Sequence, residues 1–363
     1  MREGQGGEAM QFGLVIDLTR QTPDQRMEQV NEEVLELVQM AEAGGFHSAY
    51  AAEHHTIEFI VGPNPFQVLV YWGSHTKTIR LGTAVAVAPY WHPIRLAGEA
   101  ALADVLTGGR IELGIGRGAY QHEFDRMTGG MIQQKGGAYM REMLPAIFKL
   151  WQGDYAHDGD LWKWPKATSV PKPLQNPLPT WVAARDPDTF DFAIKNGCDI
   201  MSTPLSKPFA ECEVLATKLQ KSIADNPGYR RPRWSILRRA CVYDAPDGWK
   251  VPVECSIRYG RGFENLFRQL GDVHNGFPEL ISFEDAQDKA VYHPDAVRTS
   301  MVFGTPPEVV SHLRKYEAIG CDIFLFGMSY GLPHDVAKRS LRLFIDEVMP
   351  HFAEKGAKGV AAQ

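Results

Sequence analysis

The sequence predicts a closed (β/α)8 TIM barrel, the α/β fold in which parallel strands alternate with outer helices. Short apolar runs alternate with longer amphipathic stretches along most of the 363 residues, a pattern typical of repeated βα units. Glycines follow three expected helices, at Gly44 and Gly45, at Gly197 and at Gly320, where a helix end needs left-handed backbone. Eight candidate strands favour a closed barrel over an open sheet, and we expect one barrel domain over residues 10–353.

The first half of the chain supplies four of the expected strands, at residues 11–17, 46–52, 79–88 and 110–116. Between the first two strands, apolar residues recur every three or four positions and so form one helix face. These residues are Met27, Val30, Val34, Val38 and Ala41. Further helices are expected at residues 93–106 and 138–151.

The second half continues the alternation. Strands are expected at residues 180–184, 198–202, 234–243 and 322–326, and helices at 187–196, 208–224, 307–319 and 334–348. Residues 245–303 break the pattern, because they mix glycine, proline, charge and aromatics without a period. This stretch is too long for an ordinary connection. We interpret it as an insertion after strand seven with its own short helices, which serves as a lid or as the interface of a homo-oligomer.

Composition narrows the class of partner. Lys and Arg total 38 against 44 Asp and Glu, without a basic block, which argues against binding to nucleic acid or to an anionic membrane. The five cysteines form no C-x-x-C pair, so neither a disulfide framework nor a zinc ribbon is predicted. The start of the chain lacks the apolar segment of a signal peptide, and no apolar run approaches the ~20 residues of a spanning helix. We therefore expect a cytoplasmic protein. Residues 1–9 and 355–363 are expected to be loose ends.

Residues that directly follow the strands are the candidates for chemistry, because active sites of such barrels lie at the C-terminal ends of the strands. Glu53, His54 and His55 follow the second strand. Adjacent residues of an extended chain point in opposite directions, so only one histidine is expected in a given pocket. The alternative is a surface cluster, and no metal site is predicted because further ligands in a known spacing are missing.

Two more segments suggest anion binding. Gly114, Gly116 and Ala119 formally satisfy a dinucleotide-binding pattern, but neither a following helix nor an acidic strand end supports it. Arg117, among these glycines, is instead a candidate anion ligand. After the fifth strand, Asp186 is the expected N-terminal cap of a helix. The free N–H groups of that helix, with Arg185 and Thr189, could bind a phosphate. The alternative is a plain capping segment, since the carboxylate of Asp186 would repel a phosphate.

Several motifs together resemble the bacterial luciferase-like flavin-dependent monooxygenases. They lie at residues 52–55 (AEHH), 81–85 (LGTAV), 88–93 (APYWHP), 108–118 (GGRIELGIGRG), 123–124 (EF), 304–306 (GTP) and 347–350 (EVMP). The resemblance implies a two-component enzyme that receives reduced FMN from a separate flavin reductase. With O2, it would insert one oxygen atom into a small organic substrate.

The resemblance also implies roles for individual residues. His54 matches the catalytic histidine and Glu53 its neighbour in the flavin site. Ala84 and Val85 match a cis peptide under the isoalloxazine ring, and Arg117 matches the phosphate-binding arginine. Asp186 and Thr189 match phosphate contacts at the helix start, where Arg117, Arg185 or Lys135 would have to offset the charge of Asp186.

One departure from the family concerns Gly116, which stands where luciferases carry a reactive cysteine, so light emission is not implied. Two alternatives remain: a deazaflavin (F420)-dependent oxidoreductase on the same barrel, and a non-catalytic flavin-binding relative, against which the Glu53–His54 pair argues. A flavin that activates O2 needs a pocket from which water is excluded, and aromatic side chains could line such a pocket. The candidates are Phe59, Tyr90, Trp91, Tyr120, Tyr259, Phe263 and Phe267.

Overall fold

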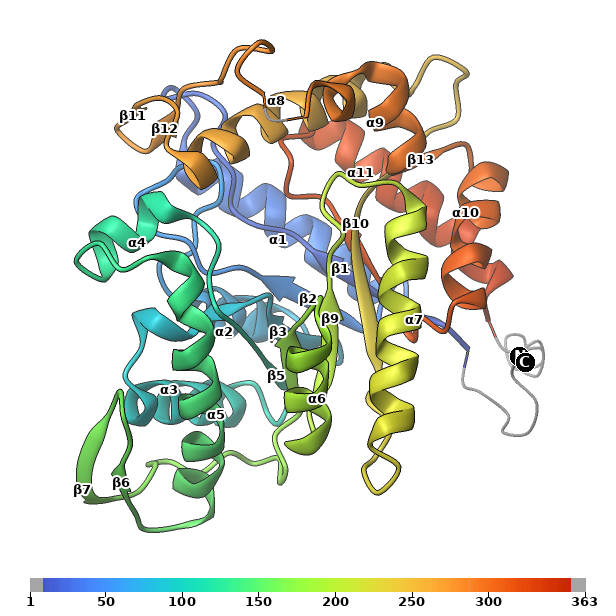
Figure 1. The fold of residues 1–363 in the computed structure, drawn as a ribbon. Coiled ribbons are helices and arrows are strands. Elements are labelled where there is room, and N and C mark those ends of the chain that lie inside the picture. The colour runs from blue at the N-terminus through green and yellow to red at the C-terminus, as the bar shows by residue number, and fades with distance from the viewer. Residues whose placement is uncertain (1–8, 287, 354–363) are drawn as a thin grey trace.

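The computed structural model describes residues 9–286 and 288–353, so the expected loose ends lie outside the described residues except for Ala9. Its centre is a closed parallel barrel, in which β14 pairs with β1 and β10 while β10 also pairs with β9 (Figure 1). The barrel strands are β1 (Gln11–Val15), β2 (Ser48–Ala51), β3 (Arg80–Thr83), β5 (Ile111–Gly116), β8 (Thr180–Ala183), β9 (Asp199–Ser202), β10 (Trp234–Val242) and β14 (Ile323–Gly327). The prediction of a (β/α)8 barrel is confirmed.

Helices cover the outside of the barrel. They are α1 (Met27–Ala43), α2 (Pro65–His75), α3 (Pro93–Leu106), α4 (Gln121–Met127), α5 (Gly136–Gln152), α6 (Pro187–Lys195), α7 (Phe209–Asp225), α10 (Pro306–Ala318) and α11 (His334–Leu343). Helix α2 was not predicted from the sequence. It begins where the Asn64 side chain accepts a hydrogen bond from the Phe66 N–H, and it buries Phe66, Leu69 and Trp72. Within the described residues, no helix is long and apolar enough to cross a membrane.

The expected strand at residues 79–88 is interrupted. Strand β3 stops at Thr83, the Ala84–Val85 peptide bond is cis, and β4 (Ala86–Val87) then pairs with β5. A short 3-10 helix over Ala88–Tyr90 follows, and another covers Gln133–Lys135. An additional hairpin, β6 (Tyr155–Asp158) with β7 (Lys163–Ala167), extends from the end of α5 and was not predicted either.

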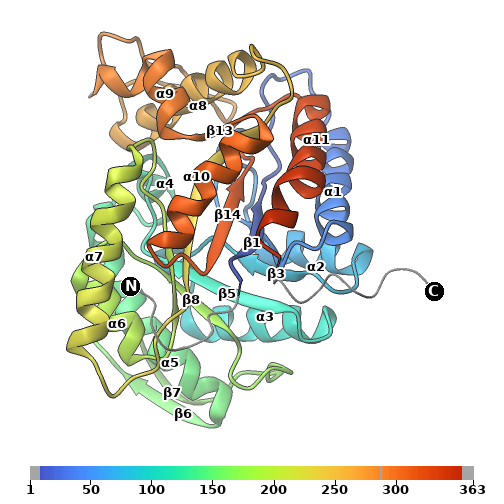
Figure 2. The same ribbon diagram turned by 90° about the vertical axis from the view of Figure 1, so that its right-hand side faces the viewer.

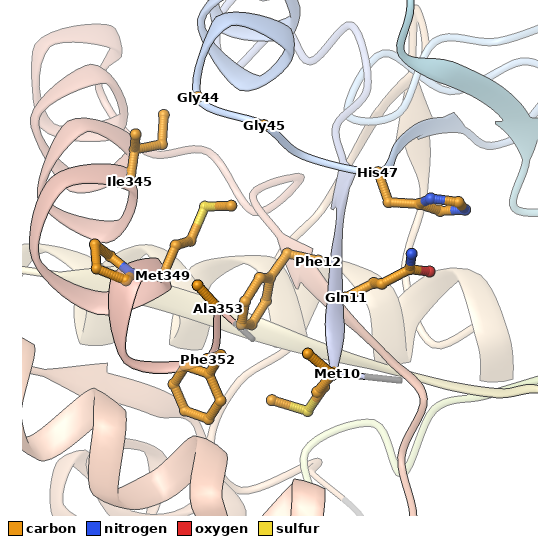
Figure 3. A pocket seen from close by; sticks show the side chains of 12 residues that line it. Met10, Gln11, Phe12, Gly44, Gly45, His47, Ile345, Met349, Phe352 and Ala353 are labelled. Atoms are coloured by element: carbon orange, nitrogen blue, oxygen red, sulfur yellow. The ribbon is translucent and has the colours of Figure 1, made fainter. Parts of the chain in front are cut away.

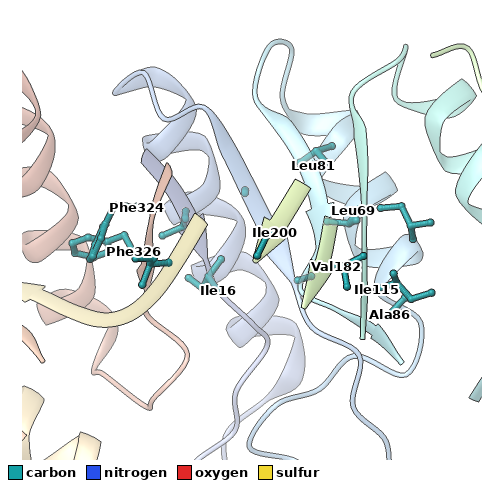
Figure 4. Packing of buried hydrophobic residues seen from close by; sticks show 14 of the residues in the cluster. Ile16, Leu69, Leu81, Ala86, Ile115, Val182, Ile200, Phe324 and Phe326 are labelled. Atoms are coloured by element: carbon teal, nitrogen blue, oxygen red, sulfur yellow. The ribbon is translucent and has the colours of Figure 1, made fainter. Parts of the chain in front are cut away.

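Two apolar layers hold the barrel. The larger layer lies between strands and helices, where Leu69 of α2 packs with strand residues such as Leu81 and Ile115 (Figure 4). The smaller one fills the barrel interior with Val15, Tyr50, Trp181, Met201, Ile323 and Leu325. This interior plug fills the barrel, so packed side chains separate its two ends. We call the C-terminal end of the barrel strands the mouth.

The insertion at residues 245–303 differs from its prediction. It contains one long helix, α8 (Lys250–Arg268), with the shorter α9 (Pro294–Ser300), a 3-10 turn (Lys289–Tyr292), the hairpin β11 (Val273–His274) and β12 (Phe277–Pro278), and strand β13 (Val302–Gly304). Expecting only short helices was wrong: α8 is amphipathic over its whole length, but small or polar residues such as Ser256, Gly260 and Asn265 share its buried face and obscure the apolar period. Helix α8 packs on α4 and α9 at the mouth, at the top of Figures 1 and 2.

A cavity of about 680 Å³ lies at the opposite end of the barrel. Phe12 at the start of β1, His47 and Met349 line it (Figure 3). The last turns of the described chain, over Phe344–Val348 and Met349–His351, close one side. The predicted site residues are not part of its lining.

Candidate active site

His54 lies at the mouth, directly after β2. Its N–H donates to the Gly62 carbonyl over 3.1 Å, and this close approach needs a glycine because a Cβ at position 62 would lie 2.2 Å from the Ala52 oxygen. The His54 ring stacks on Tyr120 with centroids 4.7 Å apart. Its Nδ1 lies 3.1 Å from Oε1 of Glu123, whereas its Nε2 has no hydrogen-bond partner among the described residues. The ring is therefore oriented by protein on one side and free to exchange a proton on the other.

Electrostatics raise the pKa of His54. Burial alone lowers it, but the negative charge of Glu123 and the hydrogen bond to Nδ1 outweigh burial, and Asp17 and Glu53 add to the effect. Burial also raises the pKa of Asp17, whose Oδ1 accepts a hydrogen bond from the Ala52 N–H over 2.7 Å. His54 therefore carries a proton to higher pH than an ordinary histidine, as a proton donor near neutral pH requires.

Glu123 is the partner that sequence reasoning missed. It lies on α4 with its side chain 1% exposed, and one oxygen also accepts a hydrogen bond from the His55 N–H over 2.6 Å. The sequence offered one signal, because Glu123 belongs to a motif that carried the family resemblance. Nothing in that motif placed it beside His54, which is 69 residues earlier in the chain.

We expect Glu123→Gln to lower the pKa of His54, since the largest charge that opposes burial is then removed. The limb of the pH–rate profile that reports His54 should move to lower pH. Asp125→Asn is the matched control, because it removes a negative charge from an exposed position of the same helix. An unchanged profile for Glu123→Gln would show that Glu123 does not set the protonation of His54.

Glu53 is buried and fully engaged by protein. One oxygen lies 2.9 Å from Nε2 of His55, and the other accepts from the Val87 N–H over 2.6 Å and from Nε1 of Trp91 over 2.7 Å. The carboxylate thus fixes β4 and the segment after it beneath the mouth. Glu53 was expected in the flavin site, and these contacts make it a positioning residue. His55 belongs to the same hydrogen-bond network.

The Ala84–Val85 segment lies at the mouth between β3 and β4, and its peptide bond is cis as the resemblance implied. Two glycines of β5 make room for it. A Cβ at Gly114 would lie 1.9 Å from the Thr83 oxygen, and one at Gly116 would lie 2.6 Å from Cγ2 of Val85. A cysteine at position 116 would therefore force Val85 to move, which gives the departure from the luciferases a steric reason.

Arg185, Asp186 and Thr189 lie together at the start of α6, and Arg117 follows β5 close enough for its charge to act on Arg185. Asp186 caps the helix as expected, accepting from the Thr189 N–H over 2.9 Å and from its hydroxyl over 3.0 Å. Arg185 is exposed, and loss of hydration together with the charge of nearby Arg117 lowers its pKa. Among the described residues, neither Arg117 nor Arg185 forms an ion pair with a carboxylate.

Arg141 of α5 joins this group and was not predicted. Its Nη2 donates to the Thr189 hydroxyl over 3.1 Å, and its guanidinium lies 5.9 Å from the ring centroid of Phe192. An isolated arginine on an amphipathic helix gives no sequence signal for such a contact. We call Arg117, Arg141, Arg185, Asp186 and Thr189 the anion cluster.

Most of the predicted aromatic residues gather at the mouth. Phe59, Tyr120, Tyr259, Phe263 and Phe267 belong to one apolar cluster that joins the insertion to the barrel. Tyr120, which stacks on His54, contacts Phe263 edge to face at 5.1 Å. Tyr90 and Trp91 lie apart from this cluster and contact His55 and Phe66, respectively.

Comparison with known proteins gives the family. The model of the luciferase-like monooxygenase family matches residues 10–322. The oxygenase component of a flavin-dependent trigonelline monooxygenase from Acinetobacter baylyi is 40% identical over 95% of this chain and 96% of that protein.

Two solved structures share the fold over 95% of this chain. The monooxygenase RslO1 from Streptomyces bottropensis has a TM-score of 0.78 at 23% identity and is covered over its whole length. The oxygenating constituent of 3,6-diketocamphane monooxygenase from Pseudomonas putida, with FMN bound, has a TM-score of 0.73 at 19% identity and is covered over 99%. The predicted class of flavin-dependent monooxygenase is confirmed, and the chain belongs to the luciferase-like monooxygenase family.

Proposed function

We propose that this protein is the oxygenase of a two-component system, which takes reduced FMN from a separate reductase and inserts one oxygen atom into a small organic substrate. The observation that carries the proposal is the His54–Glu123 pair, with a free Nε2 at the mouth and the anion cluster after β5 and β8 of the same barrel. Reduced FMN, when bound, supplies the electrons that activate O2. The protein residues supply binding, orientation and proton transfer.

The donors at the mouth suit a flavin with a phosphate. Arg117 and Arg185 are two close cations without an ion-pair partner among the described residues, and Arg141 lies behind Thr189. The side chains of Arg117 and Arg185 are both exposed, so water screens their repulsion, and a bound dianion would replace it with attraction. The carboxylate of Asp186 is satisfied by Thr189, so its charge is partly offset before any phosphate binds. Ala84 and Val85 offer a half-buried apolar surface for a flat ring.

His54 then gives or takes a proton at Nε2, while Glu123 holds its ring and charge in place. The aromatic cluster around Tyr120 keeps water from the same region. We assign the insertion at residues 245–303 to this task, as a lid over the mouth, because α8 contributes Tyr259, Phe263 and Phe267 to that cluster. A homo-oligomer stays a prediction.

Replacing Arg117 with alanine should weaken FMN binding by about 1.5–3 kcal/mol, the contribution of a hydrogen bond between charged groups. Riboflavin has no phosphate and should bind equally well to both proteins. Isothermal titration with each flavin measures the difference. Arg314→Ala is the control, since that residue pairs with Glu317 on the outer helix α10. Equal losses for FMN and riboflavin would assign Arg117 to another role.

The function itself is tested with reduced FMN from a reductase, O2 and candidate substrates, scored by a product that gains one oxygen atom. Trigonelline, the compound named for the relative from Acinetobacter baylyi, is the first candidate. Anaerobic hydride transfer with a reduced deazaflavin would support the F420-dependent alternative instead. Flavin binding without turnover across a broad panel would support the non-catalytic alternative.

A further inference from the structure

Arg239 is a cation at the mouth that the chemistry above does not use. Along β10, Leu237 belongs to the interior plug, whereas the next residue, Arg238, points outward and donates to the carbonyls of Leu205 and Lys207. Side chains alternate along a strand, so Arg239 faces the interior, one layer above Leu237. It pairs in register with Gly327, the last residue of β14. Arg239 thus stands at the rim of the barrel.

Only part of the guanidinium of Arg239 is engaged by protein. Its Nη1 donates to the Ser256 carbonyl over 3.2 Å and to the Ser256 hydroxyl over 2.6 Å, and its Cζ lies 4.5 Å from the ring centroid of Tyr259. Within the described residues, its Nε and Nη2 donate no hydrogen bond and no carboxylate forms an ion pair with it. The fully buried polar atoms without a partner include Nε of Arg238 but no atom of Arg239. The free donors of Arg239 therefore face solvent at the mouth.

Arg239 and His54 share one region of the mouth. The charge of Arg239 acts on both Tyr259 and Tyr120, and Tyr120 stacks on the His54 ring. The anion cluster lies elsewhere around the barrel, because Arg117 follows β5 and Arg185 follows β8, and β9 separates β8 from β10. Because a strand lies between Arg239 and the anion cluster, the phosphate assigned to that cluster leaves Arg239 without a ligand.

A partly buried cation without a counter-ion is costly, and a ligand that brings a negative charge removes the cost. Burial lowers the pKa of Arg239 below its ordinary range, and the tyrosines only partly oppose this. An arginine fork with free Nε and Nη2 donors matches the two oxygens of a carboxylate. Tyr259 and its neighbours Phe59 and Phe263 offer aromatic surface next to it.

We propose that Arg239 binds the carboxylate of the substrate, so that the enzyme acts on a small organic anion whose apolar or aromatic body packs against the cluster around Tyr259. This assignment rests on the proposed oxygenase function, since it concerns the substrate of that reaction. It gives Arg239 a role in binding the substrate and leaves the flavin phosphate to the anion cluster.

Binding of two probe molecules tests this directly. Benzoate and benzamide have the same shape and differ in charge, and isothermal titration measures each against protein saturated with oxidised FMN, which occupies the anion cluster. We expect the protein to prefer benzoate about ten-fold or more, as a charged hydrogen bond implies. Arg239→Gln should bring the preference close to one, and Arg239→Lys should retain part of it.

Controls separate this role from others. Arg258→Gln removes an exposed arginine from the same helix that carries Tyr259 and should leave the preference intact. The inference is overturned if the unaltered protein binds benzoate no better than benzamide, or if Arg239→Gln keeps the preference and weakens FMN binding instead. A benzoate preference that depends on Arg239 in a protein that never transfers oxygen would refute the proposed function while supporting the anion site.

Discussion

Alanine in place of His54 should reduce turnover by about 10²–10⁴-fold, the range for loss of a general acid or base. The reason is that no other described histidine combines a position at the mouth, a raised pKa and a free ring nitrogen with a buried carboxylate on the opposite side. FMN affinity should stay within a few-fold, because the anion cluster is untouched. Product formation and FMN titration on the same preparation provide the measurement.

A second variant guards against a merely steric explanation. His54→Gln keeps a hydrogen-bonding group of similar length but cannot carry a proton at neutral pH, so it should be as impaired as the alanine variant. If either variant kept near-normal turnover with intact product, proton transfer at His54 would not limit the reaction, and the assignment of His54 as the catalytic residue would fail.

Loss of Glu53 should have the largest effect on stability. Glu53→Ala leaves the Val87 N–H and Nε1 of Trp91 without an acceptor and removes the partner of His55. Each buried polar group left unsatisfied costs about 1–3 kcal/mol, so the free energy of unfolding should fall by about 3–5 kcal/mol. Urea denaturation, followed by tryptophan fluorescence, measures it.

Glu53→Gln is the matched comparison. Its amide oxygen can accept from both Val87 and Trp91, and its NH2 group can donate to a neutral His55, so most of the network survives. We expect a loss of about 1 kcal/mol. A Glu53→Ala variant as stable as the unaltered protein would mean that the carboxylate serves the flavin site alone.

Local sequence signals sufficed for the barrel but not for every element. Apolar runs and helix-ending glycines located the barrel strands. They missed α2, whose apolar residues, such as Val68, Val70 and Trp72, have no clear helical period and are typical of a strand. They also missed the interruption at Ala84–Val85, because residues 83–87 contain neither proline nor glycine to mark it, and the contacts with Gly114 and Gly116 of β5 are not visible in the sequence.

The same distinction between local and long-range signals applies to the site residues. His54, Arg117, Arg185 and the Asp186 cap follow from their places at strand ends and at a helix start, which the sequence displays. Glu123, Arg141 and Arg239 lie on elements whose packing decides what they contact. Arg141 meets Thr189 across 48 residues of chain, and Arg239 meets α8, a helix whose buried face mixes small and polar residues with the apolar ones.

The pairing of β13 with β10 determines how the insertion is attached. Ala240 pairs with Val302 and Val242 with Gly304, so the chain leaves the barrel and returns to it along the same strand. Because the two attachment points are already adjacent, the entropy of closing this loop depends only weakly on its length. Segments of quite different size can therefore replace residues 245–303 without disturbing barrel closure. Substrate specificity can change through this segment while the barrel and its site residues stay the same.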